Sequence, residues 1–163
     1  MKKISVIIPA YNEEESLPLL YDRMEKLMND MQNYEFEILF VNDGSKDKTL
    51  EIIKNMREKD NRICYVDFSR NFGKEIAMIA GLDYATGDCV VFMDADLQDP
   101  PELIPQLVKY WEEGYDDVYA KRRSRKGETW LKKFTSKVYY RVLQHLTKVE
   151  IQEDTGDFRL LDR

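Results

Sequence analysis

The stretch CVVFMDAD, residues 89–96, joins five apolar residues to a pair of carboxylates. A short apolar run without polar alternation is typical of a strand buried on both faces of a parallel sheet. Further strands are expected at 4–8, 37–41, 63–68 and 117–120. Helices with apolar residues three or four positions apart are expected at 17–31, 48–59, 76–84, 103–111 and 130–146. This alternation predicts an α/β protein, a mostly parallel sheet between two helical layers.

Composition favours one compact domain over residues 1–163, because 43% of the residues are hydrophobic and 34% are charged. No apolar run approaches the roughly 18–20 residues that cross a bilayer, and the first residues do not resemble a signal peptide. Cys64 and Cys89 lie in strand-like runs, so we expect reduced core residues of a cytosolic protein. A single histidine, His145, argues against a histidine-based triad.

Charge is distributed unevenly along the chain. The formal net charge is −6, yet residues 121–148 contain ten basic residues and one acidic residue, a charge of +9 on a body of −15. This asymmetry indicates an anionic partner, either a phosphate-bearing ligand or a negatively charged membrane surface. Nucleic acid is disfavoured because the rest of the surface would repel it. A solvated helix face is the alternative interpretation.

Polar clusters follow four of the expected strands, at residues 9–15, 42–47, 69–74 and 94–99. Ligands of open α/β sheets bind beside the carboxyl ends of the strands. We therefore expect these clusters to converge on one crevice.

The residues of these clusters suit a metal and a phosphate. Asp94 and Asp96 project to the same side of an extended chain, and a hard cation, Mg²⁺ or Mn²⁺, would relieve their repulsion. Gln98 would add a neutral oxygen. Residues 69–74 combine two cations with a glycine and could face a diphosphate. The alternatives are an acidic turn that caps the next helix and, at Asp43, a helix-capping turn instead of a ribose or base contact.

Four ordered motifs resemble those of family 2 glycosyltransferases: SVIIPAYNEE at 5–14, VNDGSKDKT at 41–49, SRNFGKE at 69–75 and FMDADLQDPPE at 92–102. The last two are similar to the subgroup that makes polyprenyl-phosphate sugars. That subgroup includes dolichyl-phosphate mannose synthases and the bacterial undecaprenyl-phosphate glucosyltransferases of the GtrB type. The resemblance covers nearly the whole chain and implies a GT-A fold, a nucleotide-sugar donor, a divalent cation and inversion at the anomeric carbon.

The resemblance also implies roles for individual residues. The nucleotide pocket would be lined by Pro9, Tyr11, Glu13 and Asp43, with Asp43 on the base or ribose. Asp94 and Asp96 would serve the metal and the diphosphate, and Gln98 would be a further metal ligand.

Asp157, in the run DTGDFR at 154–159, matches the position of the catalytic base. Lys121, Arg122 and Arg123 would face the donor diphosphate or an acceptor phosphate. A sugar hydroxyl needs a general base, whereas a lipid phosphate is already anionic near neutral pH. Asp157 could then orient the acceptor or balance charge, so its role stays open.

The resulting expectation is a catalytic domain that transfers a hexose from a UDP- or GDP-sugar to polyprenyl phosphate. A family 2 transferase that extends a glycan and a non-catalytic nucleotide-sugar-binding module are the alternatives. Residues 130–146 are expected to lie on an anionic membrane surface or to pack on the protein's own sheet. GtrB-type members continue into transmembrane helices, so we expect a truncated part of a membrane protein that works at the cytoplasmic face. A soluble member and a homo-oligomer are further options.

Overall fold

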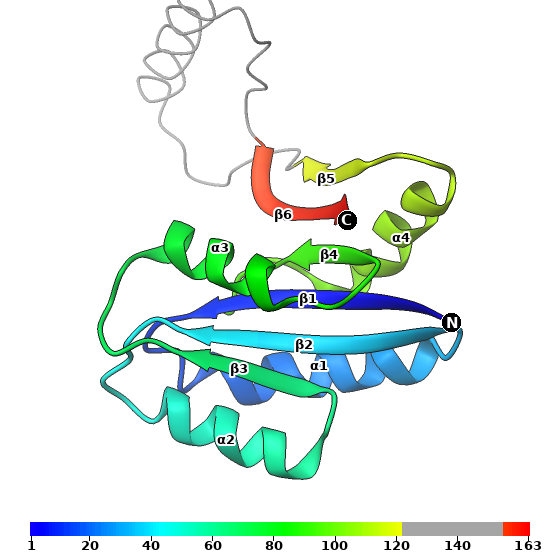
Figure 1. The fold of residues 1–163 in the computed structure, drawn as a ribbon. Coiled ribbons are helices and arrows are strands. Elements are labelled where there is room, and N and C mark those ends of the chain that lie inside the picture. Colours follow the sequence, from blue (N-terminus) through cyan, green and yellow to red (C-terminus); the bar gives the residue numbers. More distant parts are fainter. Residues whose placement is uncertain (122–154) are drawn as a thin grey trace, which may run out of the picture. The chain divides into compact units, whose positions relative to one another are not determined.

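The computed structural model describes residues 1–121 and 155–163 and shows an α/β fold (Figure 1). Two compact units are distinguished, Met1–Tyr119 with Asp157–Arg163, and Ala120–Gly156. A single domain over residues 1–163 stays a prediction. The described elements are β1 (Lys2–Ala10), α1 (Ser16–Asp30), β2 (Tyr34–Asn42), α2 (Thr49–Lys59), β3 (Ile63–Asp67), α3 (Lys74–Tyr84), β4 (Cys89–Phe92), the 3-10 helix η1 (Pro101–Leu103), α4 (Ile104–Glu112), β5 (Asp117–Lys121) and β6 (Thr155–Asp162).

The six strands form one sheet in the order β3-β2-β1-β4-β6-β5. Strands β3, β2, β1 and β4 are parallel, with Ile7 of β1 opposite both Leu39 of β2 and Phe92 of β4. Strand β6 runs antiparallel to β4 and pairs Arg159 with Phe92. The expectation of a mostly parallel sheet is confirmed, and β6 adds an antiparallel member between β4 and the edge strand β5.

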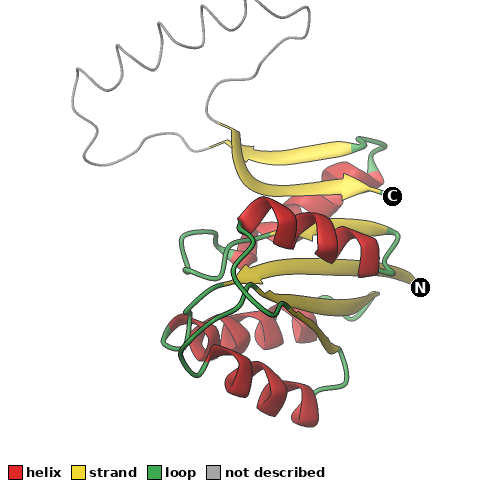
Figure 2. Ribbon diagram, turned by 60° about the vertical axis from the view of Figure 1, so that its left-hand side comes forward, coloured by secondary structure: helices red, strands yellow, loops and turns green. Residues whose placement is uncertain are grey.

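Helices cover both faces of the sheet (Figures 1 and 2). Helix α3 lies on one face and α1 and α2 lie on the other, as the two views agree. The core under α3 includes Ile7, Val41, Ala77 and Phe92. Gly81 of α3 rests on Ile7 so closely that a Cβ at position 81 would overlap the isoleucine side chain. The absence of a side chain at this glycine therefore sets how near α3 approaches β1.

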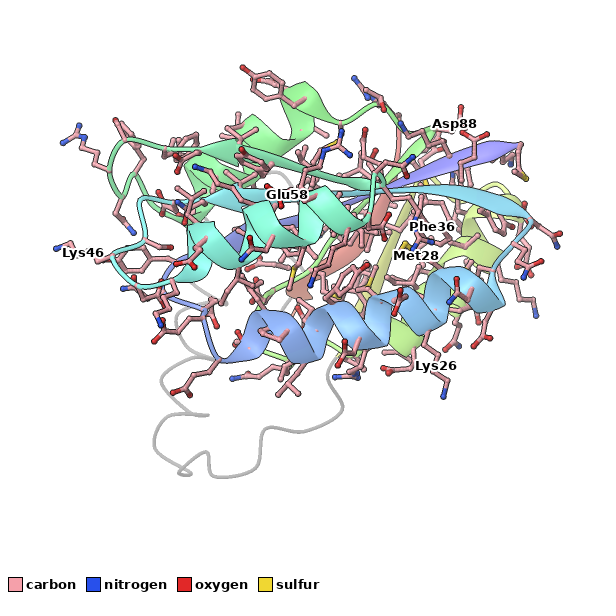
Figure 3. All side chains as sticks on the ribbon, turned by 90° about the horizontal axis from the view of Figure 1, so that it is seen from below. Lys26, Met28, Phe36, Lys46, Glu58 and Asp88 are labelled. Atoms are coloured by element: carbon pink, nitrogen blue, oxygen red, sulfur yellow. The ribbon has the colours of Figure 1, made fainter. Side chains whose placement is uncertain are left out.

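The opposite face is packed by the apolar stripe of α1. Leu17, Leu20 and Met24 are fully buried, as the spacing of three and four residues predicts. Figure 3 shows Met28 and Phe36 between α1 and the sheet, with Lys26 on the outer side of the helix.

The expected elements agree with the observed ones to within a few residues, except that the helix expected at 130–146 lies outside the described residues. Cys89 is buried and Cys64 is partly buried, and both are free, as their strand positions predict. Within residues 1–121 and 155–163, no helix has the length and apolar character that crossing a membrane requires.

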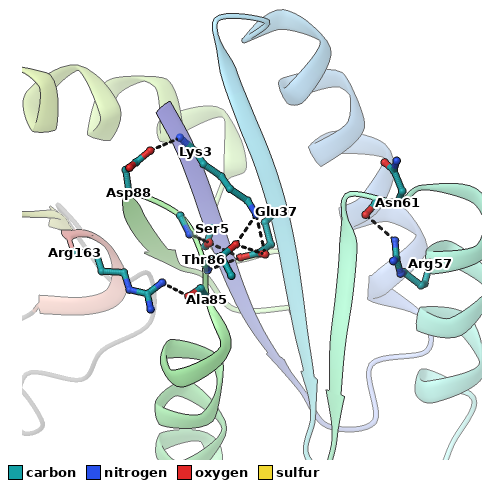
Figure 4. A network of polar contacts seen from close by, with 10 residues as sticks. Lys3, Ser5, Glu37, Arg57, Asn61, Ala85, Thr86, Asp88 and Arg163 are labelled. Carbon is teal, nitrogen blue, oxygen red and sulfur yellow. Dashed lines mark hydrogen bonds and ion pairs between the residues drawn. The ribbon is translucent and has the colours of Figure 1, made fainter. Parts of the chain in front are cut away.

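A buried carboxylate joins the strands near their amino ends (Figure 4). Glu37 of β2 accepts hydrogen bonds from the Ser5 hydroxyl of β1 at 2.5 Å and from the Thr86 amide and hydroxyl at 3.0 and 2.8 Å. The Lys3 ammonium lies 3.2 Å from the same carboxylate. The network therefore fixes the loop before β4 against β1 and β2.

Candidate functional site

The loops at the carboxyl ends of the parallel strands enclose a cleft of about 380 Å³. Small-molecule sites usually have volumes of roughly 300–1,000 Å³. The cleft is lined by Pro9, Ala10, Tyr11, Glu13, Asp43, Asn71, Gly73, Lys74, Asp94, Ala95 and Asp96. The expected convergence of the polar clusters on one crevice is confirmed, and the role of each residue stays a prediction.

The loop after β1 is joined to the loop after β2 by side-chain to backbone hydrogen bonds. Asn12 has a positive φ of 55°, a conformation that asparagine tolerates better than most residues. The Asn12 side-chain oxygen accepts a hydrogen bond from the Lys46 backbone amide at 2.8 Å, and the Asn12 backbone amide donates to the Ser45 hydroxyl at 3.0 Å. The Glu13 amide donates to the Thr49 hydroxyl at 2.8 Å. These contacts place Tyr11 and Glu13 at the wall of the cleft.

Asp43 anchors the loop that follows β3. Asp43 is 3% exposed, and its two carboxylate oxygens accept the Phe72 and Gly73 amides at 2.7 and 3.0 Å. Gly44 has a φ of +65°, and a Cβ there would overlap the backbone of Arg70. The sequence predicted a ribose or base contact for Asp43, and the structure adds this anchoring of residues 72–73. Each carboxylate oxygen retains a second lone pair for a ligand.

The triplet Asp94-Ala95-Asp96, here called the acidic triplet, follows the end of β4. Asp94 is partly buried and its amide donates to the Asp99 carboxylate at 3.1 Å. Burial raises the pKa of Asp94, and the Asp99 and Asp96 carboxylates add to the rise against the opposing effect of Lys74. Asp96 is exposed at the rim, and its oxygen accepts the Gln98 amide at 3.0 Å. The side chain of Gln98 is exposed and is not among the cleft-lining residues, and its part as a metal ligand stays a prediction.

A lysine connects the acidic triplet with the last strand. The Lys74 Nζ lies 2.5 Å from Asp94 Oδ1 and 2.7 Å from Asp157 Oδ2. Burial would lower the pKa of Lys74, but its hydrogen bonds to Asp157 and Asp94 outweigh burial and raise that pKa. Asp157 of β6 is exposed and reaches the cleft through this lysine. The sequence indicated Lys74 only as one of two cations near a diphosphate, since local spacing does not show which carboxylates it meets.

The other cation of that loop, Arg70, is exposed and lies over the Phe72 ring at 4.6 Å from its centroid. Lys121 ends β5, but its side chain, like Arg122 and Arg123, lies outside the part of the chain whose side chains are described. The basic residues expected to face phosphates therefore stay predictions.

The cleft offers side-chain ligands for a metal cation that a bound substrate would coordinate as well. Within residues 1–121 and 155–163, no three Asp, Glu, His or Cys side chains are grouped closely enough to form a metal site on their own. Asp94 and Asp96 supply two carboxylates, and Mg²⁺ sites commonly combine one or two carboxylates with substrate phosphates. The residues present therefore fit a divalent cation that binds together with a phosphorylated ligand.

The sequence profile of the family described as "Glycosyl transferase family 2" matches residues 5–163. The chain belongs to glycosyl transferase family 2. Among family relatives, an uncharacterized glycosyltransferase of Synechocystis sp. is 53% identical over 99% of this chain and 50% of its own. The bactoprenol glucosyl transferase of Shigella phage SfX is 44% identical over 99% of this chain and 52% of its own.

Solved structures share the fold of this family 2 chain. Staphylococcus aureus TarS, solved in complex with UDP-GlcNAc, is 29% identical with a TM-score of 0.64 over 78% of this chain and 36% of its own. A Pyrobaculum calidifontis mannosyltransferase, in complex with GDP-Man and Mn²⁺, is 21% identical with a TM-score of 0.63 over 99% of this chain and 45% of its own. The chain spans about half the length of the curated relatives it matches.

Proposed function

We propose that this chain is the catalytic domain of an inverting hexosyltransferase that uses a UDP- or GDP-sugar, a divalent cation and a polyprenyl phosphate acceptor. The observation that carries the proposal is the cleft itself, where Asp43, Asp94 and Asp96 converge with Lys74 at the carboxyl ends of parallel strands. The acceptor class is supported by the 44% identity to bactoprenol glucosyl transferases over nearly the whole chain.

The donor nucleotide would occupy the side of the cleft formed by the loops after β1 and β2. Tyr11 is 42% exposed there, so its ring can offer a flat surface on which a base stacks. Pro9 and Glu13 complete this wall, and Asp43 offers carboxylate lone pairs to the base or ribose. UDP-GlcNAc and GDP-Man in two proteins of the same fold support a nucleotide-sugar ligand.

The donor diphosphate would lie against the acidic triplet. Four carboxylates and one lysine are among the lining residues, so an anionic diphosphate needs additional positive charge. Asp94 and Asp96 would hold Mg²⁺ or Mn²⁺, with Gln98 as a further ligand. When bound, the cation would stabilise the negative charge that develops on the departing diphosphate. The Mn²⁺ in the mannosyltransferase complex supports this requirement.

The transfer itself needs a nucleophile on the far side of the anomeric carbon. A phosphate oxygen of the lipid would form the new bond to that carbon while the bond to the diphosphate oxygen breaks, which inverts the configuration. A phosphate monoester is largely doubly ionised near neutral pH, so it needs little deprotonation. Asp157, held beside the cleft by Lys74, would orient the acceptor or balance charge, and Arg122 and Lys121 would contact phosphate oxygens.

Residues 121–148 would bring this site to the cytoplasmic face of a membrane. Their charge of +9 suits an anionic lipid surface, where each basic residue contributes about 1 kcal/mol of attraction. Charge reversal at Lys132, Lys133 and Lys137 should weaken binding to anionic liposomes, and unaltered partitioning would favour a solvated face.

Transfer to a lipid can be measured directly with the full-length protein. Membranes that contain it are incubated with labelled UDP-glucose or GDP-mannose and extracted with organic solvent, and label is expected in the lipid fraction. Asp96→Asn should remove this signal because one cation ligand is lost, whereas Asp83→Asn, on the exposed side of α3, should not. Label confined to the aqueous polymer would instead indicate glycan extension. Binding of UDP and Mn²⁺ without turnover would indicate a binding module.

A further inference from the structure

Lys74 bridges one carboxylate in the loop after β4 and another in β6. Its ammonium lies 2.5 Å from Asp94 Oδ1, beyond the end of β4, and 2.7 Å from Asp157 Oδ2, in β6. Both distances are those of charge-assisted hydrogen bonds. Oδ1 of Asp94, a cleft-lining residue, is therefore already engaged by a positive charge of the protein itself.

The backbone fixes the point from which the Lys74 side chain extends. Lys74 is the first residue of α3, and the preceding Gly73 has a φ of 100° and donates its amide to Asp43 at 3.0 Å. The helix is held on the sheet by Ala77, which is fully buried, and by Gly81 against Ile7. The lysine thus starts from a fixed point at the wall of the cleft.

The cleft has little positive charge besides that of Lys74 among its described lining residues. Among the described lining residues, Lys74 is the single basic side chain, beside Glu13, Asp43, Asp94 and Asp96. A divalent cation at Asp94 would meet this ammonium at short range, and like charges at such separations repel strongly. A diphosphate changes this balance because its oxygens can accept hydrogen bonds from the lysine and coordinate the metal as well.

We propose that Lys74 is a tethered counter-cation that occupies Asp94 in the free protein and thereby couples divalent-cation binding to donor binding. Metal alone binds weakly because it competes with the ammonium. Metal and nucleotide diphosphate together bind tightly, because the diphosphate satisfies both cations. This inference rests on the proposed donor and metal site, and it assigns Lys74 the part of a ligand-binding residue within that site.

The test measures Mn²⁺ affinity of the full chain by calorimetry, with and without saturating UDP. UDP should tighten Mn²⁺ binding to the wild-type protein. Lys74→Met should tighten the binding of Mn²⁺ alone by about tenfold, a typical coupling between two sites, and should reduce the effect of UDP. Lys74→Arg keeps the charge and should behave as the wild type. Lys54→Met removes an exposed lysine of α2 and controls for net charge.

A gain of metal affinity distinguishes competition from damage, since a disrupted site would bind Mn²⁺ less tightly. Wild-type Mn²⁺ affinity in Lys74→Met, with UDP-dependent binding retained, would overturn the counter-cation and leave the donor site standing. No uptake of Mn²⁺ by the wild-type protein, even with UDP, would overturn both the metal role and this inference. If Lys74→Met does not fold, Lys74→Gln is measured in its place. The coupling would also be refuted if UDP left the Mn²⁺ affinity of the wild-type protein unchanged.

Discussion

Replacing Glu37 with glutamine tests the polar network that joins β1, β2 and the loop before β4 (Figure 4). Glu37 is 8% exposed, and its oxygens divide the contacts. Oε2 accepts the Ser5 hydroxyl and the Thr86 amide, while Oε1 accepts the Thr86 hydroxyl and the Lys3 ammonium. Glutamine keeps the shape but has one oxygen, so only one of these two sets can be maintained.

The expected loss of stability depends on which of the two sets of hydrogen bonds glutamine cannot make. If its oxygen takes the place of Oε2, its NH₂ group faces the Lys3 ammonium, and a donor then meets a donor. A hydrogen bond to a charged group contributes about 1.5–3 kcal/mol. We therefore expect Glu37→Gln to lower the free energy of unfolding by about 2 kcal/mol. Glu35→Gln, at an exposed position of the same strand, should change it by less than about 0.5 kcal/mol.

Urea unfolding at several pH values is the appropriate assay. Burial alone would raise the pKa of Glu37, but hydrogen bonds from Ser5, Thr86 and Lys3 outweigh it and lower that pKa. The stabilisation is therefore complete above the ordinary glutamate pKa of about 4.3 and is lost as pH falls through the lower folded value. The difference between wild type and Glu37→Gln should shrink below about pH 4. A difference that stays constant from pH 7 to 3 would refute this reasoning.

Two further substitutions address the cleft. Gly44→Ala should cost at least about 2 kcal/mol of stability, from the positive φ and the overlap with Arg70, and should weaken UDP binding measured by calorimetry. Unchanged UDP affinity would show that residues 69–74 do not form part of the donor site. Asp157→Asn should leave UDP affinity within about twofold, while hexose transfer falls by about 10²-fold or more because the acceptor would lose its orientation. Full transfer activity in that variant would remove Asp157 from the catalytic residues.

The sequence was sufficient to predict most of the α/β framework. The apolar runs at 4–8 and 89–93 correspond to β1 and β4. Apolar residues without polar alternation favour such strands because both of their faces are covered. The convergence of the loops followed from parallel pairing, which brings the carboxyl ends of the strands to one edge. Local pattern and general topology therefore located the cleft.

Two features depended on contacts between distant residues and were not predicted from local pattern. Strand β6 pairs antiparallel with β4 across a sequence separation that periodicity does not reveal. Lys74 meets Asp157 across 83 positions, so its two ion pairs become visible only once the sheet is assembled. The positive φ of 64° at Leu97, between Asp96 and the exposed Gln98, is likewise a backbone feature that the motif did not reveal.

The place of β6 in the sheet has a consequence for synthesis of the chain. β4 ends at Phe92, whereas the strand that covers its free edge is finished only at Asp162. At about 5–20 residues per second, a ribosome needs on the order of 3–15 s to add the intervening stretch. During that interval the most hydrophobic strand presents unpaired backbone amides and carbonyls, which other nascent chains could pair with. Fragments that end before residue 155 would keep this edge of β4 unpaired, so fragments chosen for expression should extend through Asp162.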